Sequence, residues 1–234
     1  MENKKTKIAI VIVIILIIAF VLLSYFSYNT QTKQLSLLTQ EANNILEANL
    51  DEYSIEFDIK TEKDYAEVEK AIKEYILKLQ NIYVEMKEMV SEINPNSIFS
   101  ASNMPDKNLK EIDNIINEYK EKSQSIIEEY QELVKEEKII ENINNRNINV
   151  RKDYYIELYD EVMLSEAMKS KYNKLEEKIK NQKSRLYEKL NKVGKIKVFL
   201  EENEKFWIVT GDKIQFNNLN KMTEYYTLLN QIID

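Results

Sequence analysis

The chain contains no cysteine and no histidine among its 234 residues. Without cysteine it cannot form a disulfide, a zinc–thiolate site or a thiol nucleophile. Without histidine it cannot build a Ser-His-Asp triad, an HExxH zinc site or the Glu-x-x-His motif of a di-iron bundle. Only oxygen ligands remain for a metal ion, and no segment has the spacing of a calcium-binding loop. We therefore expect no enzyme activity, no cofactor and no metal site.

Glycine and proline are also scarce, with two residues of each. Average usage would give about 16 glycines and 12 prolines in a chain of this length. Because both residue types make turns and interrupt helices, their scarcity argues against sandwiches, barrels and doubly wound folds. Charged residues of both signs make up 31% of the chain, as is typical of solvated helices. The composition therefore predicts a mainly α-helical protein.

Acidic residues outnumber basic residues by 40 to 33, which gives a formal net charge of −7. Domains that bind nucleic acid usually carry a basic face, so we expect no nucleic-acid partner. Several acidic residues are adjacent, such as Glu128-Glu129 and Glu176-Glu177. Neighbouring residues on a helix point about 100° apart, so these pairs do not face one another as an acid and a base would. They indicate a solvated helix face.

One long apolar run lies near the N-terminus. Residues 8–26 are 19 residues without a charge, long enough to cross about 30 Å of hydrocarbon as a helix. We predict a transmembrane signal anchor at residues 8–28, with lipid as its partner and apolar contacts from Ile8, Ile12, Ile15, Phe20, Leu23 and Phe26. Three lysines precede the run (Lys4, Lys5 and Lys7), whereas only Lys33 follows closely. By the positive-inside rule, residues 1–7 are expected in the cytoplasm and the body outside it, at the cell membrane.

Two alternatives to a retained anchor remain open. A cleaved signal peptide would need a pattern of small residues after the apolar core, but bulky Tyr25 and Phe26 stand there. An inverted topology would place the body in the cytoplasm.

Beyond the anchor we expect a membrane-proximal helix and linker at residues 29–60 and a long antiparallel bundle at residues 61–203. The bundle is expected to be elongated and coiled-coil-like, with three to four helices. Its first apolar seam steps by three and four residues through Tyr65, Val68, Ile72, Tyr75, Leu79, Ile82, Met86, Met89 and Ile93. Thr61 and Asp64 resemble a capping box at its start.

Two further seams predict two more long helices. One runs from Leu109 to about Ile143 and includes Ile112, Ile116, Tyr119, Ile126, Tyr130, Leu133 and Ile140, with Ser123 and Glu137 as polar lapses. The other is expected to run unbroken from about Val150 to at least Val193 and includes Leu158, Val162, Met168, Tyr172, Leu175, Ile179, Leu186 and Leu190. Gly194 is expected to interrupt the latter helix.

Both prolines lie in the connection at residues 94–106, so the chain reverses there and neighbouring helices pack antiparallel. This connection carries three apolar residues, Ile98, Phe99 and Met104, which a plain linker would not need. They are a candidate interaction loop that meets a partner or the membrane surface. The alternative is that they fold back and seal the end of the bundle.

The C-terminal residues 204–234 change in character. Two β-prone runs, 206–210 and 213–216, flank Gly211-Asp212 and predict a β-hairpin, with Ile208 on the same face as Ile214 and Phe216. A two-stranded hairpin is barely stable alone, so we expect it to pack on a final helix at about residues 218–233.

These patterns indicate a structural, scaffold or protein-interaction component of the bacterial cell envelope, with a protein partner or self-association. The alternative is a sensor or ligand-binding ectodomain that signals through a separate membrane partner.

Overall fold

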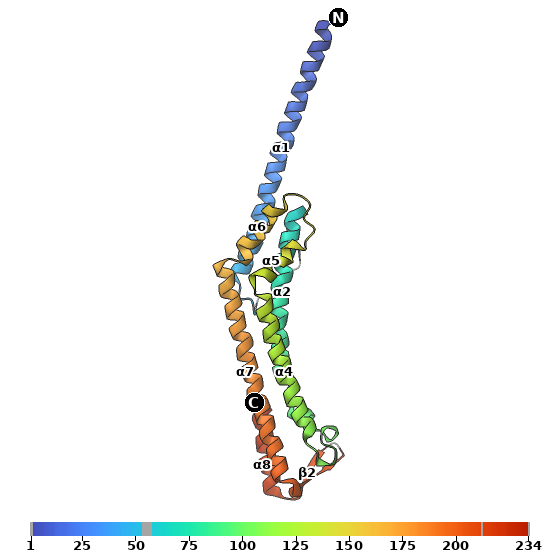
Figure 1. The fold of residues 1–234 in the computed structure, drawn as a ribbon, viewed down its shortest axis with the longest axis vertical. Coiled ribbons are helices and arrows are strands. Elements are labelled where there is room, and N and C mark those ends of the chain that lie inside the picture. The colour runs from blue at the N-terminus through green and yellow to red at the C-terminus, as the bar shows by residue number, and fades with distance from the viewer. Residues whose placement is uncertain (1, 53–57, 212, 234) are drawn as a thin grey trace. The chain divides into compact units, whose positions relative to one another are not determined.

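The computed structural model describes the backbone of residues 2–52, 58–211 and 213–233. Within these ranges it leaves out the side chains of residues 2–15, 17, 23, 25, 26 and 233. The described chain is mainly helical (Figure 1). Its α-helices are α1 (Glu2–Glu47), α2 (Lys63–Glu92), α3 (Pro95–Ile98), α4 (Lys110–Leu133), α5 (Glu136–Asn144), α6 (Lys152–Met163), α7 (Glu166–Glu202) and α8 (Leu219–Ile233). Two strands, β1 (Trp207–Thr210) and β2 (Lys213–Phe216), precede α8, and short 3₁₀ turns lie at Ala101–Asn103, Pro105–Lys107 and Glu204–Phe206.

The chain divides into two compact units. The first unit comprises residues 1–74 and 140–165, and the second comprises residues 75–139 and 166–234. In the first unit, α1, the start of α2, and α6 bury apolar side chains that recur every three or four residues. These buried residues include Leu38, Ala42, Ile45, Tyr65, Val68, Ile72, Tyr159 and Met163.

Neighbouring helices of the second unit run antiparallel, as their cross-links show. The Tyr75 hydroxyl donates to the Leu133 carbonyl oxygen, and Glu85 pairs with Lys122, so α2 and α4 run in opposite directions. The same reversal relates α4 to α7 through Gln131–Glu176 (2.8 Å), Gln124–Lys183 and Asp113–Lys197 (3.1 Å). It also relates α7 to α8, since Lys192 donates to the Gln231 carbonyl oxygen and the Lys221 ammonium lies 5.6 Å from the centroid of the Phe199 ring. The predicted helical bundle is confirmed in this unit.

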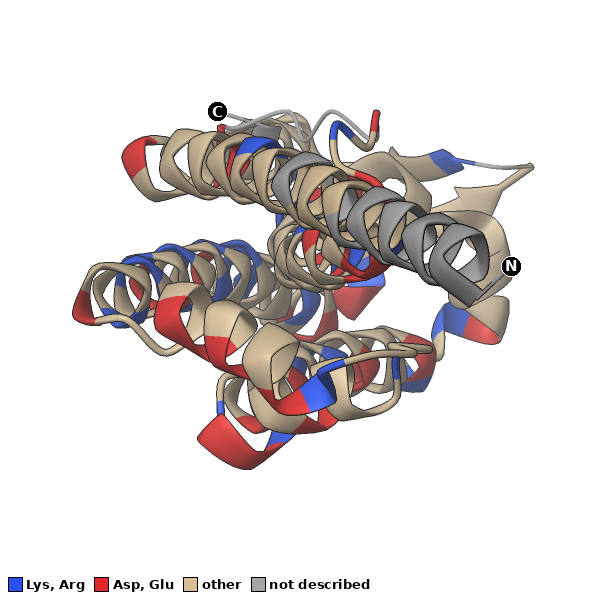
Figure 2. Cartoon of the chain, turned by 90° about the horizontal axis from the view of Figure 1, so that it is seen from above, with Lys and Arg blue, Asp and Glu red and all other residues tan. Residues whose placement is uncertain are grey.

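Charged positions of both signs are interspersed along the helices (Figure 2). The polar lapse at Ser123 is fully buried, but its hydroxyl donates to the Lys120 carbonyl oxygen at 2.8 Å. A serine can occupy an apolar slot in this way because the helix backbone satisfies its hydroxyl.

The two later helices are not continuous, contrary to the sequence prediction. One is interrupted after Leu133 and the other after Met163. At each interruption the buried stripe shifts by one residue: Ile139 is buried instead of Ile140, and Tyr159 and Met163 are buried instead of Leu158 and Val162. A strict heptad drifts around a straight helix, and a short break resets which face is buried.

Gly194 does not interrupt α7, which continues to Glu202. An interior glycine costs a helix about 1 kcal/mol relative to alanine. Val193, Ile196 and Leu200 are fully buried around it, and the burial of three such side chains outweighs that cost.

The predicted hairpin and final helix are confirmed, but the face assigned to Ile208 is wrong. Thr210 pairs with Lys213, and this register places Ile208 opposite Gln215 with half of its surface exposed. The inner face instead carries Trp207 with Phe216 and Val209 with Ile214. Because side chains alternate along a strand, a register set by the turn decides the whole face. The hairpin packs on α8, where the Phe216 and Tyr225 rings lie 5.2 Å apart.

Candidate functional site

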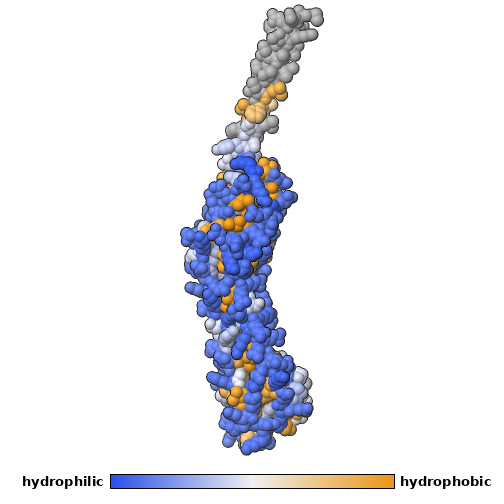
Figure 3. Space-filling model, viewed as in Figure 1, coloured by the Kyte–Doolittle hydropathy of each residue, from blue (hydrophilic) through white to orange (hydrophobic). Residues whose placement is uncertain are grey.

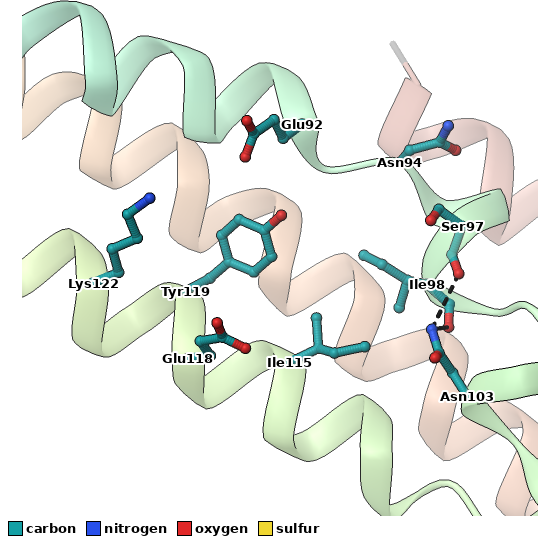
Figure 4. Close-up of a pocket in the computed structure, with 9 residues that line it drawn as sticks. All are labelled: Glu92, Asn94, Ser97, Ile98, Asn103, Ile115, Glu118, Tyr119 and Lys122. Carbon is teal, nitrogen blue, oxygen red and sulfur yellow. Dashed lines mark hydrogen bonds between the residues drawn. The ribbon is translucent and has the colours of Figure 1, made fainter.

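A cleft of about 330 Å³ lies in the second unit, beside the loop that joins α2 to α4 (Figure 4). Its walls come from the end of α2, the start of this loop and the middle of α4. The lining residues are Glu92, Asn94, Ser97, Ile98, Asn103, Ile115, Glu118, Tyr119 and Lys122. The volume falls within the range of small-molecule sites, about 300–1,000 Å³.

The loop wall of the cleft is held by local hydrogen bonds. Pro95 follows Asn94, and a residue before proline is disfavoured in a helix, so α2 does not continue through Asn94 and ends at Glu92. The Asn94 side chain then caps the one-turn helix α3 by accepting from the amide of Asn96 at 3.0 Å. The Asn103 amide nitrogen donates to the carbonyl oxygens of Ser97 and Ile98, at 3.2 Å and 3.0 Å (Figure 4). These bonds leave the Asn103 amide oxygen as an acceptor at the cleft.

The charges around the cleft are unbalanced. Lys122 pairs with Glu85 at 3.4 Å, on the α2–α4 side of the cleft. Within the described part of the chain, neither Glu92 nor Glu118 has a hydrogen-bond or ion-pair partner. Burial raises the pKa of the Tyr119 hydroxyl, and the negative charges of Glu92 and Glu118 raise it further. The cleft is thus an electronegative environment.

The three residues of the candidate interaction loop point inward. Ile98, Phe99 and Met104 are 6%, 4% and 1% exposed, so their side chains close this end of the second unit. Only Ile98 also lines the cleft. Direct contact between these side chains and a partner would require them to leave the core. The surface of the loop is formed by other residues, including Ser102 and Asp106, which are exposed.

Most of the predicted anchor lies outside the described side chains. This holds for the lipid-contact residues Ile8, Ile12, Ile15, Leu23 and Phe26 and for the topology lysines Lys4, Lys5 and Lys7. Phe20 is described and is 71% exposed, as part of an apolar surface with Leu16, Ile18, Val21 and Leu22 (Figure 3). Across the residues whose placement is described, no helix contains a stretch long and apolar enough to cross a membrane.

A buried charge cluster in the first unit was not anticipated from the sequence. Lys73 is 2% exposed, and its ammonium lies 2.7 Å from Glu69, 2.8 Å from Glu41 of α1 and 3.0 Å from the Asp58 carbonyl oxygen. Glu69, at 1% exposure, also accepts from the amide of Lys60 at 3.0 Å. The only available signal was a Glu–Lys pair four residues apart, next to the seam positions Val68 and Ile72.

Thr61 belongs to this cluster and does not form the predicted capping box. Its hydroxyl and amide both donate to Glu69, at 2.8 Å and 2.9 Å. Asp64 instead accepts from the amides of Asn149 and Val150. A buried carboxylate needs hydrogen-bond donors, because an unsatisfied charge is costly in the interior. Thr61 therefore donates to Glu69 and does not cap the start of α2.

The protonation states of the cluster follow from these contacts. Burial raises the pKa of Glu69, but hydrogen bonds from Lys73, Lys60 and Thr61 outweigh it and hold the pKa below its usual value. Burial likewise lowers the pKa of Lys73, but Glu41 and Glu69 hold it above the usual value. Both groups are therefore charged at neutral pH.

Among the described residues, no group of three acidic side chains is placed to hold a metal ion. Neither a protein family, nor a curated protein, nor a solved structure matches this chain.

Proposed function

We propose that the chain is a single-pass membrane protein whose helical body acts outside the cytoplasm, as a scaffold or protein-interaction component of the bacterial cell envelope. The observation that carries the proposal is the continuity of α1 from Glu2 to Glu47. The uncharged residues 8–26 and the core residues Leu38, Ala42 and Ile45 belong to this one helix. An anchor that enters a packed core without a flexible linker would hold a bound partner at a defined distance from the bilayer.

The contacts of α1 with α2 and with the residue before it support the scaffold role, because they fix the helix that carries the proposed anchor to the packed body. Glu41 of α1 pairs with the buried Lys73 of α2 at 2.8 Å. The Gln34 side chain of α1 also accepts from the amide of Glu62, the residue that directly precedes α2, at 2.8 Å. Polar contacts with buried partners are costly to break, so they oppose sliding or rotation of α1 against the rest of the first unit.

Cysteine labelling tests which side of the membrane each part of the chain faces. The native chain gives no background labelling, because it contains no cysteine. We expect a membrane-impermeant maleimide to label an Asn181→Cys variant, on the exposed face of α7, in intact cells. An Asn3→Cys variant should react only after the membrane is permeabilised. Labelling in the reverse order would establish the inverted topology, and release of the body from the membrane fraction would establish cleavage.

Site-specific photo-crosslinking tests the interaction role. Phe99 is buried, so the photoreactive residue belongs at exposed Ser102 of the same loop, with exposed Glu129 of α4 as the control position. The proposal expects one discrete adduct from Ser102 and none from Glu129. An adduct of twice the chain mass indicates self-association, and a smear or an equal pattern from both positions contradicts a defined partner.

The cleft beside the α2–α4 loop favours a second candidate, a ligand-binding ectodomain that signals through a separate membrane partner. The two candidates differ in what changes when a ligand is added. A sensor requires that ligand binding alter the crosslinks or labelling of the body, whereas a scaffold gives the same pattern with and without ligand.

A further inference from the structure

The cleft of the second unit presents two carboxylates that have no partner in the described part of the chain. Glu92 closes the last turn of α2, and Glu118 lies in the middle of α4. In Figure 4 the Tyr119 side chain lies between them, and both carboxylates act on its hydroxyl electrostatically. An acidic group without a partner at the rim of a cavity is an acceptor available to a ligand.

The floor between these acceptors is apolar and partly sheltered. Ile98 is buried, Ile115 and Tyr119 are half-buried, and all three line the cavity. The Asn103 amide oxygen adds a neutral acceptor at the loop wall, since the nitrogen of this amide is occupied by two backbone carbonyls. A ligand that fits this arrangement has a short hydrocarbon chain and donors at its ends.

The negative charge of the cleft favours a positively charged ligand. The cleft is lined by the carboxylates of Glu92 and Glu118 and by one ammonium, that of Lys122, which is already paired with Glu85, a residue outside the lining. An anion would meet repulsion from the two lining carboxylates, whereas a cation gains from both. Quaternary ammonium recognition uses a cage of several aromatic rings, but the lining here contains one ring. Carboxylate acceptors instead suit a primary ammonium, which has N–H donors.

We infer that this cleft is a binding site for a small aliphatic amine, with a diamine preferred over a monoamine. One ammonium binds at Glu92 and the other at Glu118, while the methylene chain lies against Ile98, Ile115 and the Tyr119 ring. The site is independent of the membrane anchor, because every lining residue belongs to the second unit.

Isothermal titration of the full chain in a non-ionic detergent tests this site, with 1,4-diaminobutane as the probe. We expect one equivalent to bind, n-butylamine to bind more weakly, and the neutral isostere 1,4-butanediol not to bind. Glu92→Gln and Glu118→Gln should each weaken diamine binding about five- to tenfold, because each removes one charged acceptor. Both positions are exposed, so the variants retain the fold.

A matched control is Glu129→Gln, which removes the same charge from an exposed position on α4. It lies about 16 Å along the helix from Glu118 and should leave diamine binding unchanged. The inference is overturned if the diamine produces no binding, if butanediol binds equally, or if all three Glu→Gln variants weaken binding alike. Calcium serves as a further probe, and tighter binding of calcium than of the diamine would identify a metal site instead.

Discussion

Lys73 and Glu69 form an ion pair at 2.7 Å, one turn apart on α2, and both are almost fully buried. Neither could be tolerated alone in that position, because an unpaired charge in the interior costs several kcal/mol. The pair is shared with Glu41 of α1 and with the backbone of residues 58–61. It therefore joins three stretches of the first unit at one point.

Removal of the ammonium should destabilise the first unit. Lys73→Met keeps most of the side-chain volume but leaves Glu69 and Glu41 without their cation, and the expected cost is about 3–5 kcal/mol. Hydrogen exchange read by mass spectrometry should show lost protection in residues 58–74, where the amides of Lys60 and Thr61 donate to Glu69. The control is Lys70→Met, and loss of the half-exposed pair that Lys70 forms with Glu67 should cost under about 1 kcal/mol. Equal effects of the two variants would show that the buried pair does not stabilise the unit.

The same pair predicts how stability depends on pH. The pKa of Glu69 is held below its ordinary value of 4.5, so its contribution is present above about pH 4.5 and lost as the pH falls. The pKa of Lys73 is held above 10.5, so its contribution is complete below that value and lost as the pH rises beyond it. We expect a plateau between these limits. In denaturation followed by circular dichroism, the advantage of the native chain over Glu69→Gln should shrink below about pH 4.5. A constant difference down to about pH 3 would contradict this assignment.

The hydroxyl of Tyr130 predicts a loss of stability in the second unit. It is fully buried and donates to the Tyr172 carbonyl oxygen of α7 at 2.7 Å, and burial raises its pKa. Tyr130→Phe should reduce the free energy of unfolding by about 1 kcal/mol through the lost hydrogen bond. Tyr226→Phe removes a hydroxyl from a half-exposed ring on α8 and should change stability by less than about 0.5 kcal/mol. Indistinguishable melting of the two variants would refute the role of the hydrogen bond.

The two glycines should respond oppositely to the same substitution. A methyl group at Gly194 would meet no atom within 4 Å, so Gly194→Ala should stabilise α7 by about 1 kcal/mol. Gly211 has φ +58 at the hairpin turn, a conformation that costs other residues about 1–2 kcal/mol, so Gly211→Ala should destabilise the hairpin. Thermal unfolding of both variants measures the difference. A stabilised Gly211→Ala variant would show that the turn does not need its left-handed conformation.

The sequence alone determined the secondary structure class and most of the buried stripe. Steps of three and four residues give an apolar face to any helix, so Val68, Ile72 and Leu175 were predictable core positions, and all three are buried. Gly211 between two β-prone runs likewise predicted the hairpin, since the turn is a local feature. The apolar run at residues 8–26, with its preceding lysines, remains a prediction that rests on the sequence.

Tertiary structure decided those features that depend on contacts between residues distant in the chain. The helix breaks after Leu133 and Met163 carry no glycine or proline that would mark them in the sequence. The Lys73–Glu41 pair joins residues 32 positions apart, and one cleft is lined by both Glu92 of α2 and Glu118 of α4. Periodicity specifies only the face that a helix buries. Packing decides which side chains meet across that face. It buries Glu69 against Lys73 in the first unit, and it places Glu92 and Glu118 around one electronegative cleft in the second unit.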